Sequence, residues 1–399
     1  MSTANDRYRD ALIRRATGID RLEGGIAATV LAILNATEVD LVAQIRERLD
    51  RIGVGSPTPA RIRRLQEQLR EIRAVREAAW RDVNAEVRQQ MLQFTRDESD
   101  FAQRALVQSA GIEGLVLSAP LAADLRGAAL SRPFQGRTLG QWLASLRAAD
   151  VRRLEDAVRL GFVEGEDLDS IVARVRGTRA TGFTDGILQT TRRQTEAVVR
   201  TGLTHMTTVA REGLWQANSD IIIGLRWTSV LDGRTTFICM SRDGRAAPIG
   251  SGTLPAGVQR LEPESARPPA HVNCRSIMVA IISPEGLIGR RPFVIDTTGP
   301  RRREVNFRQM ARERGIPMPQ ARREWAQRHV GSLPAETTYE EFLRRQSTAF
   351  QDDVLGRTRG ILFRRGELSI DRFVSERGRT YTLNELRRRE SEAFSEAGL

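Results

Sequence analysis

Two cysteines and a histidine are the side chains in this 399-residue sequence whose types and spacing best fit metal chemistry. Cys239 is followed by His271 and Cys274 in a C…H-x-x-C arrangement. Thiolate sulfur and imidazole nitrogen are ligands that suit zinc. The spacing supplies only three ligands. Asp243 or water could provide the fourth, and Ser276 stands where another thiolate would have helped.

Two alternatives to a zinc site remain open for these cysteines. They could be a pair of buried, reduced thiols, or they could form a disulfide, which is the least favoured because nothing in the chain indicates an oxidising compartment. The N-terminus carries charges of both signs where a secretory signal needs a basic end followed by an apolar stretch. We therefore expect no export. We also expect no cofactor, unless the Cys/His set binds zinc.

Acid–base catalysis has few candidate residues in this chain. Its three histidines are far apart in sequence: His205, His271 and His329. His271 and Asn273 have a faint similarity to a His-Asn nuclease loop, but no second histidine is near enough to complete a metal site. Glu164 and Glu166 have the E-x-E spacing of ADP-ribosyltransferases, although an acidic turn at a helix N-terminus explains them more simply. We expect a protein that is not an enzyme.

The charge of the chain favours binding to polyanions. All 62 basic residues are arginine, so loops and Schiff bases that depend on lysine are excluded. The net charge is +12, and the arginine fork suits phosphate oxygens. An inert basic surface is the alternative. Aromatic residues make up only 5%, so we expect salt-sensitive contacts to the backbone of double-stranded DNA rather than base stacking.

The N-terminal region, 1–150, has a helical pattern. Between Pro59 and Phe94 apolar residues recur at three- and four-residue spacing, which predicts one helix of about 50 Å. An earlier apolar stretch, Ile26 to Leu49, ends at Gly53. No apolar run approaches the roughly 20 residues of a membrane helix, so we expect no membrane span.

The central region, 151–285, is predicted to mix helices and strands. Expected helices are Val151–Leu160, Leu168–Val175 and Asp185–Ala217. Expected strands are Leu225–Val230, before the turn pair Asp232-Gly233, and Ser276–Ile282. A loop rich in glycine and proline is expected from Arg245 to Pro269.

The C-terminal region, 286–399, is predicted to be helical and basic, with short helices that stop at Gly315, Gly356 and Gly366. Residues 301–399 hold 21 arginines against 15 acidic residues, about half of the excess charge of the chain. The run Arg387 to Arg389 is interpreted as a solvated helix face. The sequence as a whole thus predicts a mostly helical α+β protein with a helical N-terminal arm, a small mixed central domain with a few strands and a helical C-terminal extension.

An ordered series of residues runs through the central region. A helix carries an Arg-Thr pair, a strand carries tryptophan, a D-x-R-T turn follows, and a cysteine, a D-G pair and a closing P-P-x-H-x-N-C-R element complete it. Apart from the Cys/His set, its members are Arg200, Thr201, Trp227, Asp232, Arg234, Thr235, Asp243, Gly244, Pro269, Asn273 and Arg275. The series resembles the Mu F-like phage head-morphogenesis domain over about 150–285, with Ser276 in place of the closing cysteine of that family.

The roles of the single residues can also be anticipated. We expect Asp232 and Arg234 to pair with each other or to cap the turn. Arg200 is expected to reach toward the Cys/His set, and Trp227 to lie in the core. The stretch from Thr338 to Gln346 also looks like an extension seen in such proteins.

The resemblance implies a minor component of tailed-phage heads, present in few copies. The expected partners are the portal protein, other head proteins and the DNA backbone. The expected location is inside the virion head near the portal, and in the host cytoplasm during assembly. The alternatives are a toxin-like effector or enzyme carried in the virion, such as an ADP-ribosyltransferase or nuclease, and a DNA-binding regulator, although no convincing helix-turn-helix is present.

Overall fold

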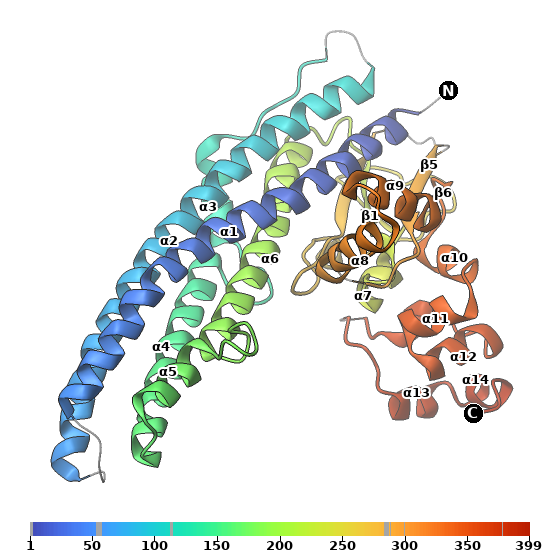
Figure 1. Cartoon of the computed structure of the whole chain (residues 1–399). Helices are drawn as coiled ribbons and strands as arrows, with labels where there is room; N and C mark the ends of the chain where they lie inside the picture. Colours follow the sequence, from blue (N-terminus) through green and yellow to red (C-terminus); the bar gives the residue numbers. More distant parts are fainter. Residues whose placement is uncertain are drawn as a thin grey trace.

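The computed structural model describes residues 3–52, 58–111, 115–282, 287, 289–298, 300–376 and 378–399. As predicted, the protein is mostly helical with a few strands (Figure 1). The helices of the elongated part are α1 (Ala4–Ile52), α2 (Pro59–Ala110), α3 (Ala122–Ser131), α4 (Leu139–Glu164), α5 (Leu168–Arg176) and α6 (Ile187–Ala217). The strands are β1 (Gly224–Thr228), β2 (Leu231–Asp232), β3 (Ala246–Pro248), β4 (Ile277–Ile281), β5 (Arg290–Val294) and β6 (Val330–Pro334). The other helices are α7 (Phe237–Arg242), α8 (Pro300–Arg314), α9 (Met318–His329), α10 (Tyr339–Arg344), α11 (Thr348–Leu355), α12 (Arg357–Arg365), α13 (Leu383–Arg389), α14 (Ser391–Glu396) and the 3-10 turns Pro263–Ser265 and Ile370–Phe373.

The two longest helices, α1 and α2, lie side by side along the elongated part (Figure 1). The Thr58 hydroxyl accepts from the Arg61 amide and caps α2, and Pro59 fits its first turn. The predicted helix therefore starts where expected, but it continues past Phe94 to a left-handed Gly111. α1 starts well before Ile26, and its end at Ile52 agrees with the expected stop. Gly53 itself lies outside the described residues.

Buried ion pairs hold the long helices together. The Asp150 carboxylate of α4 accepts from Arg76 Nε at 2.6 Å and from Trp80 Nε1 at 2.7 Å, both on α2. Further along, Glu98 of α2 is paired with Arg211 of α6 at 2.6 Å and with Arg15 of α1 at 2.8 Å. The apolar faces of these helices therefore meet in a fixed register, because each buried charge has one position where it is paired.

One helix has the length and composition needed to cross a membrane. An 18-residue window of α1 has a mean hydropathy of 1.7 and at most two charged residues, in contrast to the expectation that no apolar run comes close to that length. About 33% of this window is buried. Ile26, Val30 and Leu34 are at most 4% exposed and belong to the same hydrophobic cluster as Trp80 of α2. A helix that packs in a protein core can meet the same criterion of length and hydropathy.

Two small sheets follow the helices. In the first, β1 lies between β3 and β4 and is antiparallel to both. In the second, β5 pairs in parallel with β2 and antiparallel with β6. The expected strands correspond to β1 and β4. β3 lies within the stretch expected to be a loop, and β5 and β6 lie in the region expected to be helical. These three short strands have little apolar/polar alternation, and pairing with distant segments stabilises them instead.

The three sequence regions pack together rather than as separate units. Residue 150, the expected first boundary, falls inside α4, and residue 285 lies outside the described residues. The amide of Ile282 donates to Asn5 Oδ1 of α1 at 2.8 Å. One hydrophobic cluster contains Tyr8 and Trp227 together, so the N-terminal helices and the first sheet share a core. The second sheet joins the central and C-terminal regions in the same way.

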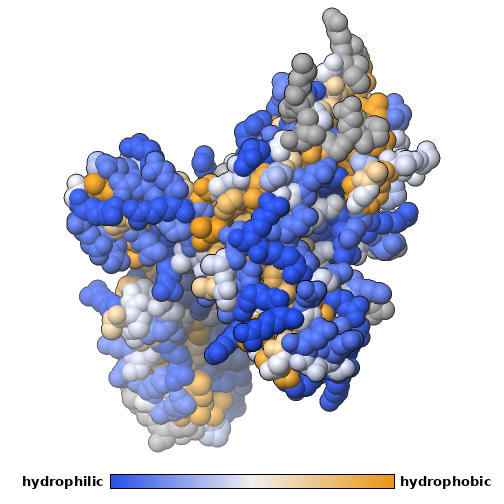
Figure 2. Space-filling view, turned by 90° about the vertical axis from the view of Figure 1, so that its right-hand side faces the viewer, coloured by the Kyte–Doolittle hydropathy of each residue, from blue (hydrophilic) through white to orange (hydrophobic). Residues whose placement is uncertain are grey.

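The C-terminal helices end where glycine predicts. α8 ends before Gly315, α11 before Gly356 and α12 before Gly366. The Arg387 to Arg389 run lies exposed on α13, which confirms a solvated helix face. The side of the molecule that carries the sheets and the C-terminal helices is mostly hydrophilic, with scattered hydrophobic side chains (Figure 2).

Candidate metal centre

Cys239, His271 and Cys274 meet in space and could bind a metal ion. The two sulfur atoms are 3.8 Å apart, and His271 Nε2 is 3.2 Å from the sulfur of Cys239. All three ligand atoms lie within 4.8 Å of one another. Two thiolates bound to one zinc ion at about 2.3 Å with tetrahedral angles have sulfur atoms about 3.8 Å apart. The sulfur positions thus fit a zinc ion without rearrangement, and both cysteines are reduced.

Three separate elements position these ligands. Cys239 lies on α7, directly after the D-x-R-T turn, while His271 and Cys274 lie on the loop that leads into β4. The loop is fixed to α6, because Thr204 donates to the carbonyl oxygen of Cys274 at 2.8 Å. Both cysteines are 2% exposed, whereas His271 is partly exposed. The set is therefore buried on the sulfur side and open on the imidazole side.

His271 has the orientation that a metal ligand needs. Its Nδ1 lies 2.8 Å from the carbonyl oxygen of Val272, a pure acceptor, so Nδ1 carries a proton and donates. In the neutral ring this leaves Nε2, the atom facing the sulfurs, with its lone pair available. Burial opposes protonation of this ring, but the hydrogen bond and charge of Cys274 favour it more strongly, so the pKa of His271 is raised.

The two thiols are electrostatically unequal. Cys239 donates a hydrogen bond to Cys274, which holds the pKa of Cys274 well below its ordinary value. The same hydrogen bond, together with burial, raises the pKa of Cys239. The hydroxyl groups of Ser276 and Thr236 act in the opposite direction and lower the pKa of Cys239, but by less. The hydrogen bond from Cys239 thus favours the thiolate form of Cys274, which is the form that binds a soft cation.

No fourth ligand comes from the described residues, since the only group of three or more potential ligands found among them is Cys239, His271 and Cys274. The expected candidate, Asp243, is wrong as a ligand, because its carboxylate accepts from Arg291, from the Ser229 amide and from the Tyr339 amide. A fourth position would therefore belong to water or to another molecule.

Other residues of the series form a cluster around these ligands, which we call the signature cluster: Thr201, Trp227, Asp232, Asp243, Asn273 and Arg275. Asp232 receives two hydrogen bonds of 2.8 Å from Arg275. Thr201 of α6 accepts from the amide of Asn273 at 2.9 Å. Asn273 has a φ of 59°, a left-handed conformation that asparagine tolerates. These contacts join α6, the turn after β2 and the loop before β4.

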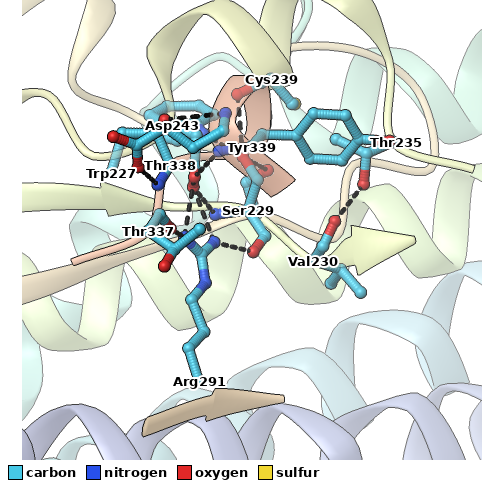
Figure 3. A network of polar contacts seen from close by, with 12 residues as sticks. Trp227, Ser229, Val230, Thr235, Cys239, Asp243, Arg291, Thr337, Thr338 and Tyr339 are labelled. Carbon is cyan, nitrogen blue, oxygen red and sulfur yellow. Dashed lines mark hydrogen bonds and ion pairs between the residues drawn. The ribbon is translucent and has the colours of Figure 1, made fainter. Parts of the chain in front are cut away.

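Asp243 is the centre of a buried polar network (Figure 3). Both of its oxygens accept from Arg291 at 2.8 Å, and its oxygens also accept from the Ser229 amide at 2.7 Å and the Tyr339 amide at 2.8 Å. Arg291 further donates to the carbonyl oxygens of Thr337 and Ser229. By accepting four hydrogen bonds, the Asp243 carboxylate ties the residue after β1, strand β5 and the start of α10 to one point.

Ser229, Arg291 and Tyr339 belong to this network and were not identified as site residues from the sequence. Tyr339 also donates through its hydroxyl to the carbonyl oxygen of Asp232 at 2.6 Å. Burial raises the pKa of this phenol well above its ordinary value. One signal in the sequence pointed to Tyr339: the stretch from Thr338 to Gln346 resembles an extension seen in the family. Arg291 lies in an arginine-rich run that gave none.

The remaining members of the series have local structural roles. Trp227 is fully buried, as expected, and donates to Ser229 Oγ at 2.9 Å. Gly244 has a φ of 81° and donates to the carbonyl oxygen of Trp227 at 3.0 Å, so the D-G pair forms a left-handed turn. Pro269 accepts from Gln135 at 2.9 Å.

Of the two contacts expected for single residues, the turn cap by Asp232 is confirmed and the reach of Arg200 is not. The Arg234 amide donates to Asp232 Oδ1 at 3.0 Å, and Thr235 donates to the same oxygen at 3.3 Å, so Asp232 does cap the turn. The bidentate ion-pair partner of Asp232, however, is Arg275. Arg200 pairs with Glu196 one turn away at 2.8 Å, so the expectation that it reaches the cysteines was wrong. Residues at i and i+4 are neighbours on one helix face, so Glu196 is within reach of Arg200.

The candidates for enzymatic chemistry are engaged elsewhere. Glu164 ends α4, and both it and Glu166 pair with Arg174 of α5. The E-x-E is thus a helix–helix linker rather than the N-terminal acidic turn that was expected. His205 is buried and stacks on Phe134.

A cavity of about 540 Å³ lies between α4 and α6, next to the loop that carries His271 and Cys274. Its walls include Phe134, Trp142 and Val272, with Arg137 and Arg152 among the polar residues. None of its lining residues is an acid, a histidine or a cysteine. It therefore lacks groups for general acid–base catalysis at neutral pH.

Comparison with protein-family models, with curated proteins and with solved structures gave no match to this chain.

Proposed function

We propose that this protein is a minor head protein of a tailed phage, which acts in head morphogenesis by binding the portal and the backbone of packaged DNA. The observation that carries the proposal is the convergence of the ordered series. Residues spread from Thr201 to Arg275 meet in the signature cluster, where Thr201 contacts Asn273 and Asp232 contacts Arg275. Residues that contact one another in this way help to specify a fold, so proteins with the same fold would share them. This supports the resemblance to the Mu F-like domain.

The environment of the signature cluster favours a structural role over catalysis. Asp232 and Asp243 are at most 5% exposed, and each is paired with an arginine. Such carboxylates stabilise the arrangement of strands and helices but have no access to a substrate. This is our reason for preferring a head protein to an ADP-ribosyltransferase or nuclease carried in the virion.

The long helices are the candidate portal-binding element. α1 and α2 have 49 and 52 residues, which corresponds to about 75 Å at 1.5 Å per residue. The apolar residues Leu22 and Val39 are exposed on α1 (41% and 68%), which leaves contact area for a partner. We propose that this helical pair docks on the inner side of the portal.

Mass spectrometry of purified virions and emptied heads tests this function, with the abundance of the chain scaled to the portal protein. A few copies per particle are expected. If the protein is present in virions but absent from emptied heads, it leaves the head together with the DNA. Absence from both preparations would contradict the proposal and favour the enzyme or regulator alternatives.

We further propose that the ion bound by Cys239, His271 and Cys274 is zinc. The sulfur–sulfur distance of 3.8 Å and the availability of Nε2 support it. Zinc would act as a structural cross-link between α7 and the loop before β4. Elemental analysis of purified protein should find about one zinc per chain, and the C239S and C274S variants should lose it. A metal-free wild type with two titratable thiols would show a plain buried thiol pair instead.

A further inference from the structure

The excess charge of the C-terminal quarter is concentrated in one structural unit, the basic hairpin, formed by α8 and α9 (300–329). This unit holds nine arginines and three acidic residues, a net charge of +6. Residues 330–399 hold twelve of each and are neutral overall. Half of the net charge of +12 therefore lies on 30 residues.

The basic hairpin has its own small core and a defined shape. Phe307 of α8 packs edge-on against Trp325 of α9, with ring centres 5.6 Å apart. Arg303 lies over the same indole ring at 4.6 Å. Gly315, with a φ of 61°, closes the turn between the helices. α8 packs chiefly on α9, and α9 leads directly into β6, so the hairpin is anchored at the second sheet (Figure 1).

The outer arginines of the basic hairpin lack acidic partners. Arg302, Arg312, Arg323 and Arg328 are exposed and make no ion pair with any acidic residue that the structure describes. Elsewhere in the hairpin Arg303, Arg308, Arg314 and Arg322 are paired with carboxylates. Arg302, Arg308 and Arg312 are all exposed on α8, and Arg308 and Arg312, four residues apart, are neighbours on one face of the helix.

We propose that the basic hairpin binds the phosphate backbone of double-stranded DNA. The inference rests on the proposed association with packaged DNA and names the element responsible. α8 is about 22 Å long, comparable to two-thirds of a DNA helical turn. The preformed hairpin presents four guanidinium groups without acidic partners among the described residues, those of Arg302, Arg312, Arg323 and Arg328, and each can hold a phosphate through two hydrogen bonds.

The composition of the hairpin favours duplex DNA over two other polyanions. Single-stranded nucleic acid is held by stacking on aromatic rings, but Trp325 and Phe307 are packed against each other. A membrane surface requires a broad apolar helix face. On α8 the exposed large apolar residue is Val305 alone, among the residues that the structure describes, since Phe307 is buried.

The test is a salt titration of DNA binding by the full-length chain. Fluorescence anisotropy with a 30-base-pair duplex measures log K against log[NaCl] for the wild type, for R302Q/R312Q/R323Q/R328Q, and for a control, R345Q/R357Q/R365Q/R388Q. The control removes the same charge from exposed arginines on or beside α10, α12 and α13. Each lost phosphate contact lowers the slope by about 0.9. We expect a drop of about 3.6 for the four substitutions of the hairpin variant and less than about 1 for the control.

Each outcome has a distinct meaning. Equal slopes for the hairpin variant and the wild type would overturn the proposal, while leaving the proposed head function to the virion measurement. A wild type that binds no duplex would remove both the hairpin site and the DNA association. Co-sedimentation with vesicles containing anionic phospholipid is the parallel assay. If the hairpin substitutions abolish vesicle binding but not DNA binding, the surface is a membrane site and the proposal fails.

Discussion

Arg291 and Arg312 are the same residue type in neighbouring parts of the chain, and their environments are opposite. Arg291 is 5% exposed and donates to Asp243, Ser229 and Thr337. Arg312 is exposed on α8 with no acidic partner among the described residues. In the signature cluster arginine is neutralised and organises the fold, whereas in the basic hairpin it remains available to an external anion. Net charge alone does not separate these two uses.

The largest effect on stability is expected from a substitution in the signature cluster, where the arginine is buried. D243N removes the charge that balances Arg291 and places an amide NH₂ against hydrogen-bond donors. We expect a loss of about 3–5 kcal/mol in the free energy of unfolding, because a buried guanidinium is left without a counter-charge. Urea denaturation followed by circular dichroism measures it. The control is D371N, since Asp371 is 43% exposed and paired with Arg245. A loss no larger than that of the control would contradict the role of Asp243.

Metal removal should have the next largest effect on stability. If a metal ion joins α7 to the loop before β4, a chelator lowers Tm by several degrees, because ligand binding to the native state contributes directly to its stability. Differential scanning fluorimetry with and without chelator measures the shift. The C274S variant should already have the lower Tm and should not respond further. An unchanged wild-type Tm would argue against a structural metal.

A pH-dependent loss of stability is expected from His205, a buried group without an acidic partner among the residues that the structure describes. Burial, together with the charges of Arg267 and Arg132, lowers its pKa from 6.5 to about 4. The unfolded chain then binds the proton more readily than the native one, so stability is complete above pH 6.5 and falls as the pH drops toward 4. The loss reaches up to about 3 kcal/mol.

This pH dependence is measured as a difference between two proteins. H205F keeps a ring against Phe134 but cannot titrate, and contributions shared with the wild type cancel. Denaturation at pH 7.5, 5.5 and 4.5 should give a wild-type curve that falls more steeply than that of H205F. Parallel curves would mean that His205 is not the responsible group.

The smallest stability effect should come from the basic hairpin. R302Q/R312Q/R323Q/R328Q removes exposed charges without acidic partners, so the free energy of unfolding should change by less than about 0.5 kcal/mol or even rise slightly, as like-charge repulsion is relieved. The same urea denaturation measures it. A large destabilisation would show that these arginines serve the fold, and the contrast with Arg291 would disappear.

Local patterns in the sequence were enough to predict much of the fold. The spacing of apolar residues predicted the core of α2, β-branched residues predicted β4, and glycines predicted the ends of α8, α11 and α12. The spacing of Cys239, His271 and Cys274 also predicted that they could meet as metal ligands. Periodicity, capping and turn chemistry act between residues close in sequence, so they can be read from the chain alone.

The tertiary structure alone decided which distant groups pair. Asp232 meets Arg275, Asp243 meets Arg291, and β2 pairs with β5, although no local signal links these partners. It also decided which arginines are neutralised and which are exposed, and so separated the signature cluster from the basic hairpin. The physical reason is that the strength of an ion pair depends on burial and geometry, and both arise only when segments far apart in the sequence pack together.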